Sequence, residues 1–263
     1  MTTAPPEERR SGAARIAVVM TVWAALTGLM FVPRDGWPWI ALGLGALGAV
    51  AMGASVARLA QAAHLAIFAA CIVGGMRLPL GTWPLPAAAG LVGYVALALA
   101  VPALRPGLAW ARWGRLDRGV LVWVAGSVAL AAAGLVSWFV IAEPDIADLL
   151  QGLPRVPGWQ LVLIAIAFSI LNAAVEEAIY RGALLQGLDA ALGAGWLAVV
   201  LQALAFGAVH LHGFPRGASG IALATVYGLM MGVLRRRSGG MLAPWLGHVA
   251  VDVTIIGILA AAG

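Results

Sequence analysis

Long apolar segments separated by short polar ones form the main pattern along this chain. Because the apolar residues are continuous rather than alternating, and because only helices and closed barrels satisfy their backbone groups in lipid, the segments favour helices. Each is close to the roughly 20 residues that span a bilayer as a helix. The segments are Ile16–Pro33, Gly36–Ala57, Leu59–Met76, Leu78–Leu104, Gly119–Ala142, Val156–Val175, Ala190–Pro215, Gly217–Leu234 and Ser238–Gly263. The pattern therefore predicts an all-α, polytopic transmembrane helical bundle with eight or nine spans.

The composition supports a membrane protein and excludes several other classes. Hydrophobic residues make up 62% of the 263 residues and charged residues 10%, whereas soluble domains carry roughly 25% charged residues. Cys71 is the only cysteine, so a disulfide scaffold is excluded. All cationic side chains are arginines that lie mostly between apolar segments. This is the distribution of a polytopic membrane protein, so we expect the lipid bilayer as a partner and no nucleic acid.

The chain divides into three parts on these grounds. Residues 1–15 are polar and are expected to form a disordered cytoplasmic N-terminus. Residues 16–118 hold N-terminal transmembrane helices and a basic loop, and residues 119–263 form a C-terminal helical bundle. Arginines near the N-terminus, in the loop and at 235–237 place these regions on the cytoplasmic side. Arginine without lysine and abundant alanine and glycine are typical of GC-rich bacteria, so we expect a bacterial inner-membrane protein.

Four charged residues lie within or next to apolar segments of the C-terminal bundle, namely Glu176, Glu177, Arg181 and Asp252. Unpaired, they would together cost roughly 10 kcal/mol in a membrane. On a helix, Glu177 and Arg181 share a face and can form an ion pair. Glu176 points about 100° away and is free to face a cavity as a base. The alternative is an ordinary salt bridge at a helix end, with Glu176 reaching water.

Two further motifs contain histidine. His210 follows Phe206 by one turn, and it lies as far after the turn near 192–194 as Glu176 lies before it. In an antiparallel helix pair this predicts equal depth, with His210 facing Glu176 and packed beside Phe206. His248 and Asp252 share a helix face. The alternative is that His210 only packs in the bundle, and that His248 and Asp252 form a buried pair that only anchors their helix.

Three motifs in one order on separate apolar segments resemble one known family. Glu176–Arg181 reads EExxxR, Phe206–His210 reads FxxxH and His248–Asp252 reads HxxxD. Together they resemble the CAAX-protease and bacteriocin-processing family of intramembrane proteases, also called the Abi or type II CAAX prenyl endopeptidase family. The resemblance covers about residues 156–258, which are thus the expected protease core.

The resemblance implies a glutamate-dependent endopeptidase that cuts a membrane-associated peptide or protein; eukaryotic relatives cut after a prenylated cysteine. Glu176 would be the base and His210 its partner in activating a water, and His248 and Asp252 would stabilise the oxyanion. Many relatives have asparagine at the position of Asp252, and an ionised aspartate cannot donate a hydrogen bond. We therefore expect His248 to donate and Asp252 to orient it. The supporting residues would be Glu177, Arg181 and Phe206.

Other interpretations stay open at this stage. No cofactor is expected, but Glu176, His210 and His248 could form a zinc site, although the chain lacks HExxH. Intramembrane carboxylates and histidines also serve proton-coupled transporters, and a non-catalytic immunity or scaffold protein could keep the motifs. The protease interpretation requires these three side chains to converge on one water-accessible cavity. His210 and His248 lie nominally toward opposite membrane faces, so we expect the segment between them to be short or tilted.

Overall fold

Each predicted apolar segment contains one main α-helix of the computed structural model, which describes residues 6–33, 36–152, 154 and 156–262. In this part of the chain the structure has no strand, which confirms the all-α prediction. The elements are α1 (Pro6–Leu29), α2 (Trp37–Val56), α3 (Ala60–Gly75), α4 (Leu85–Ala100), the 3₁₀ helix η1 (Pro102–Leu108), α5 (Arg118–Ala142), α6 (Ala147–Gln151), α7 (Gly158–Glu177), the π-helix η2 (Ala178–Leu184), α8 (Leu185–Leu192), α9 (Trp196–Val209), α10 (Gly217–Ser238) and α11 (Leu242–Ala262).

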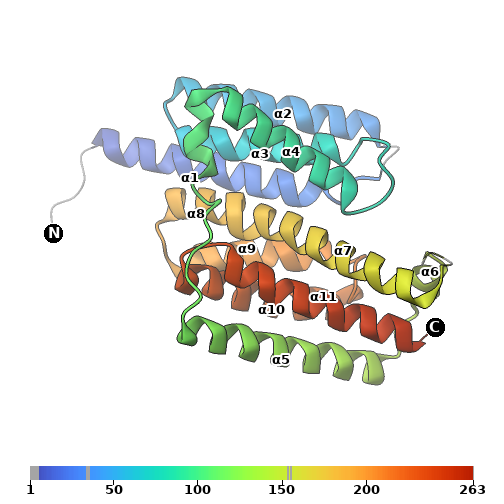
Figure 1. The fold of residues 1–263 in the computed structure, drawn as a ribbon. Helices are drawn as coiled ribbons and strands as arrows, with labels where there is room; N and C mark the ends of the chain where they lie inside the picture. The colour runs from blue at the N-terminus through green and yellow to red at the C-terminus, as the bar shows by residue number, and fades with distance from the viewer. Residues whose placement is uncertain (1–5, 34–35, 153, 155, 263) are drawn as a thin grey trace.

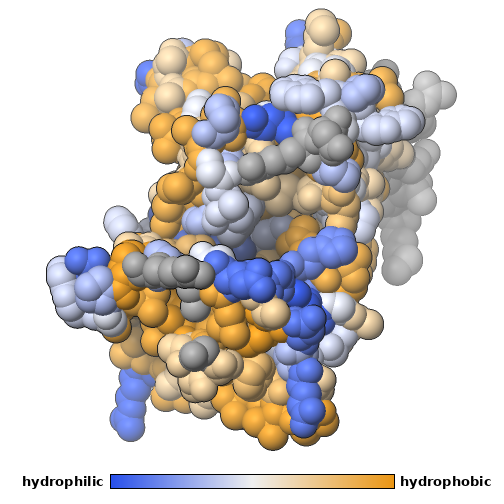
Figure 2. Space-filling model, turned by 90° about the vertical axis from the view of Figure 1, so that its right-hand side faces the viewer, coloured by the Kyte–Doolittle hydropathy of each residue, from blue (hydrophilic) through white to orange (hydrophobic). Residues whose placement is uncertain are grey.

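The outer surface and the helix lengths fit an integral membrane protein. Large apolar side chains such as Trp39, Val56 and Ile141 are 68%, 82% and 82% exposed, and much of the surface in Figure 2 is hydrophobic. Among the described residues, six helical stretches are long and apolar enough to span a bilayer, while α3, α4 and α9 are shorter apolar helices. Six spans are thus supported by length and composition, and the larger count of eight or nine stays a prediction.

One predicted boundary needs correction. The structure has α1 beginning at Pro6, so residues 6–15 are helical rather than disordered, and residues 1–5 lie outside the described part. Glutamate, arginine and alanine in this segment favour helix. Helical structure continues from the sixth apolar segment through the charged motif to Leu192. This agrees with the predicted placement of the motif on a helix and of the turn near 192–194.

The helices form two layers. Figure 1 shows α1–α4 above α5 and α7–α11. Trp23 of α1 donates a hydrogen bond to the carbonyl of Leu201 at 2.9 Å, and Gln186 of α8 donates to Gln61 of α3 at 2.9 Å. These contacts hold the upper layer on the helices that carry the three motifs.

Two arginine-bearing connections, residues 109–117 and the turn after α10, lie together at one end of the bundle. The extended link between the layers pairs with the α10–α11 turn: the Arg115 amide donates to Ser238, and the Met241 amide donates to the carbonyl of Arg112, at 2.9 and 2.8 Å. At the opposite end Arg216 pairs with Asp148 at 3.0 Å and holds the pKa of that carboxyl below its usual range. Arginines clustered in connections on one side of the bundle are the pattern that the positive-inside rule describes.

Candidate active site

Glu177 and Arg181 form the predicted ion pair. The Arg181 Nη1 lies 3.0 Å from the Glu177 Oε1, and the two side chains are 0% and 1% exposed. The guanidinium also stacks over the ring of Phe206, 4.3 Å from its centroid. A buried charge requires such compensation, so the charged motif can remain inside the helical layer.

The motif crosses from an α-helix into a π-helix. Glu177 is the last residue of α7, and η2 follows at Ala178. A π-helix has a wider turn than an α-helix and occurs often at functional sites. A side chain at Gly182 would overlap the ring of Trp110, so the glycine allows this indole to pack directly on the π-helix.

His248 lies at the centre of the carboxylates. Its Nδ1 is 2.8 Å from the Glu177 Oε1, and its Nε2 is 3.4 Å from the Glu176 Oε2. Asp252 is more distant, with its Oδ1 3.7 Å from the same Nε2. Because an ionised carboxylate only accepts, Nδ1 donates to Glu177 and Nε2 is directed to Glu176. Glu177, rather than the expected Asp252, therefore makes the hydrogen bond that orients His248.

His210 directly follows α9 and is oriented by its own helix. Its Nδ1 lies 2.8 Å from the Phe206 carbonyl oxygen, an acceptor, so Nδ1 carries a proton and a neutral ring has its lone pair at Nε2. The Phe206 ring packs against both histidines, with its centroid 4.7 Å from that of His210 and 5.9 Å from that of His248. The described residues show no direct hydrogen bond between His210 and Glu176, although both face one space.

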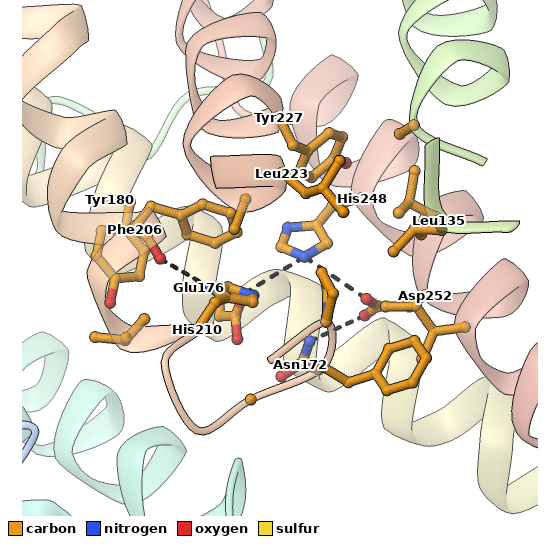
Figure 3. A pocket seen from close by; sticks show the side chains of 18 of the residues that line it. Leu135, Asn172, Glu176, Tyr180, Phe206, His210, Leu223, Tyr227, His248 and Asp252 are labelled. Carbon is orange, nitrogen blue, oxygen red and sulfur yellow. Dashed lines mark hydrogen bonds and ion pairs between the residues drawn. The ribbon is translucent and has the colours of Figure 1, made fainter. Parts of the chain in front are cut away.

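This space is a cavity of about 750 Å³, larger than a few water molecules require. It brings together four predicted residues: Glu176, His210, His248 and Asp252. Most of the remaining wall is apolar and includes Phe31, Leu135, Phe168, Leu223 and Ile255. Figure 3 shows the labelled polar side chains gathered around His248, and Figure 2 shows a recess between the layers at the end that carries α6. The expected convergence of the three motifs is therefore present in the structure.

The cavity also contains polar residues that the motifs did not identify. Asn172 donates from Nδ2 to the Asp252 Oδ2 at 3.0 Å and accepts a hydrogen bond from the Trp83 indole. Asn172 lies one helical turn before Glu176, and this spacing was a usable signal. Trp83 has no such signal, because it lies far away in the sequence, before α4. The rings of Tyr180 and Tyr227 contact Phe206 and His248.

The zinc alternative, with Glu176, His210 and His248 as ligands, stays a prediction. Within the residues that the structure describes, no group of three or more His, Cys, Asp or Glu side chains is placed to hold one metal ion. The Nδ1 atoms of both histidines are engaged by oxygen acceptors, which leaves Nε2 as the ring atom that could bind a metal.

Comparison with known proteins gives one match. Residues 158–254 match the family model described as type II CAAX prenyl endopeptidase Rce1-like. Searches of curated proteins and of solved structures found no match. The matched segment contains all three motifs and most of the polar side of the cavity. The match confirms the resemblance seen in the sequence: over residues 158–254 this integral membrane protein is similar to the type II CAAX prenyl endopeptidase Rce1-like family, a family of proteases.

Proposed function

We propose that this protein is an intramembrane, glutamate-dependent endopeptidase that hydrolyses a peptide bond of a membrane-associated peptide or protein. The observation that carries the proposal is the placement of Glu176 beside His248, 3.4 Å apart, on one cavity with His210. A base, a second proton-handling group and a donor at the wall of one cavity are what water-activated amide hydrolysis requires.

In this proposal a water molecule binds between Glu176 and His210. Glu176 accepts a proton from the water, and the His210 Nε2 accepts the hydrogen bond of its second proton, which fixes the water. The oxygen then attacks the carbonyl carbon of the substrate. The tetrahedral intermediate collapses as Glu176 returns the proton to the leaving nitrogen, so the base is regenerated.

His248 supplies the donor for the oxyanion. Its Nδ1 proton is held by Glu177, so Nε2 donates when the ring carries both protons. The nearby carboxylates of Glu176, Glu177 and Asp252 compensate the positive charge of that ring. Arg181 in turn holds Glu177, and Phe206 packs against both histidines.

The substrate enters through an apolar space. The mostly apolar wall of the cavity favours an apolar or lipid-modified peptide segment, and the name of the matching family adds prenylated CAAX peptides as the first candidates. We place the protein in a bacterial inner membrane with a cytoplasmic N-terminus, and we propose metal-free hydrolysis.

The test uses the full-length protein in liposomes with three quenched fluorescent probes. These are a farnesylated CAAX peptide, its unmodified counterpart and a library of transmembrane peptides. We expect cleavage of at least one probe, loss of cleavage by Glu176→Gln and unchanged cleavage by Glu143→Gln, which changes an exposed glutamate. A folded Glu176→Gln protein with normal turnover would refute the proposal. Inhibition by 1,10-phenanthroline that added zinc reverses would instead support the zinc site.

A further inference from the structure

A chain of hydrogen bonds connects the upper helical layer to the site. The Trp83 indole Nε1 donates to the Asn172 Oδ1 at 2.5 Å, and the Asn172 Nδ2 donates to the Asp252 Oδ2 at 3.0 Å. Asn172 and Asp252 are 7% and 5% exposed. Figure 3 shows Asn172 and Asp252 pointing toward each other beside His248. Three segments that are distant in sequence thus meet at one carboxylate.

The indole of Trp83 fixes which atoms donate and which accept along these hydrogen bonds. An indole N–H only donates, so the Asn172 carbonyl oxygen faces Trp83 and its NH₂ group faces Asp252. The carboxylate therefore receives a donor on Oδ2, while Oδ1 is directed toward the Nε2 of His248, 3.7 Å away. Without the indole the amide is free to rotate by half a turn. Its carbonyl oxygen would then face the carboxylate, and the two acceptors would repel each other.

We propose that Trp83 and Asn172 are positioning residues for the hydrolysis, because they hold the Asp252 carboxylate beside His248. This inference rests on the proposed function. It gives the upper layer a direct part in the site through Trp83, which also lines the cavity. Hydrogen bonds to a charged acceptor are stronger than those between neutral groups, so the orientation of Asn172 controls where the charge of Asp252 lies.

The test compares two single variants and their combination, in the liposomes and with the cleaved probe described above. Trp83→Phe keeps an aromatic ring and removes the N–H, and Asn172→Leu removes the amide. We expect each to lower kcat about tenfold while KM changes less than twofold, because the step affected follows binding. The double variant should be no slower than Asn172→Leu, since both substitutions break one chain. Trp39→Phe, an exposed tryptophan of α2, is the matched control and should have unchanged kinetics.

A second measurement does not depend on cleavage. In protein labelled with ¹⁵N-tryptophan, the Trp83 indole proton should resonate downfield, and Asn172→Leu should move it upfield in a protein whose other indole signals are unchanged. An unchanged chemical shift of the Trp83 indole proton in Asn172→Leu would overturn the proposal. So would a normal kcat for Trp83→Phe, or a double variant whose loss of kcat is the product of the two single losses. In each of these cases an active wild type still supports the proposed function. A wild type that cleaves no probe would overturn both, whatever the resonance shows.

Discussion

Glu177 binds two partners with one carboxylate. Its Oε1 lies 3.0 Å from Arg181 and 2.8 Å from the Nδ1 of His248, and its side chain is almost fully buried. The second carboxylate of the motif therefore joins the charge balance of the helix to the orientation of the histidine. A division into one chemical and one structural glutamate is too simple, because Glu177 acts on the site through His248.

Replacing Arg181 should lower the stability of the folded protein. Arg181→Met leaves the buried Glu177 charge without its ion-pair partner, which typically costs about 3–5 kcal/mol. We expect a lower free energy of unfolding, and a lower melting temperature in mild detergent. The matched control is Arg115→Met, which breaks an exposed pair with Asp117 and should cost at most about 1 kcal/mol. A fully stable but inactive Arg181→Met protein would contradict this and place Arg181 in the chemistry.

At the scale of elements, the contact between α9 and α10 positions the second motif. A side chain at Gly207 would overlap the Thr225 hydroxyl and crowd the Ile221 carbonyl oxygen of α10. Close approach through small residues is common in membrane bundles. His210 lies three residues after Gly207, so its place in the cavity depends on this approach.

Gly207→Ala should therefore move α9 away from α10. Overpacking of this kind costs about 1–3 kcal/mol, and we expect a lower melting temperature together with a lower kcat, because His210 is displaced. Gly48→Ala in α2 is the control, since a side chain there meets no other atom within 4 Å. Equal melting temperatures for the two variants would show that α10 adapts to the added methyl group.

The lengths of α9 and α10 show where hydropathy predicts helix boundaries and where it does not. His210 and His248 line one cavity, and α9 ends at Val209 after 14 residues. The segment that we expect to be short or tilted, α10, has 22 residues and is not short. The apolar segment 190–215 continues beyond α9 into a loop, and apolar loop residues cannot be distinguished from helix by hydropathy. The π-helix was also missed, because hydropathy does not report the hydrogen-bond spacing of a turn.

The site was predictable where partners lie one helical turn apart, and less so across helices. The Glu177–Arg181 pair and the Phe206–His210 contact follow from that spacing. The bond from Glu177 to His248 and the chain through Trp83 depend on how distant segments pack, and one sequence contains no information on such pairs. The resemblance supplied the grouping of the motifs, but not which carboxylate orients which ring.

At the scale of the whole molecule, the arrangement of charges predicts the orientation in the membrane. The arginine-bearing link at residues 109–117 and the turn after α10 share one end, and the acidic α5–α6 loop lies at the other. In a Cys71→Ala background, we expect a membrane-impermeant maleimide to label Asp145→Cys in intact bacteria, and Arg115→Cys only after permeabilisation. The opposite result would mean that the N-terminus faces outward.

The pairing of the extended link with the α10–α11 turn has a consequence for how the molecule could be made. The link is bound to the lower layer, while the contacts that join the layers, such as those of Trp23 and Gln186, lie elsewhere. The chain should therefore behave as a tethered heterodimer. Fragments 1–111 and 112–263, produced as separate polypeptides in one cell, should copurify in mild detergent through a tag on either one. Recovery of the tagged fragment alone would mean that the two layers stay together only while the link joins them covalently.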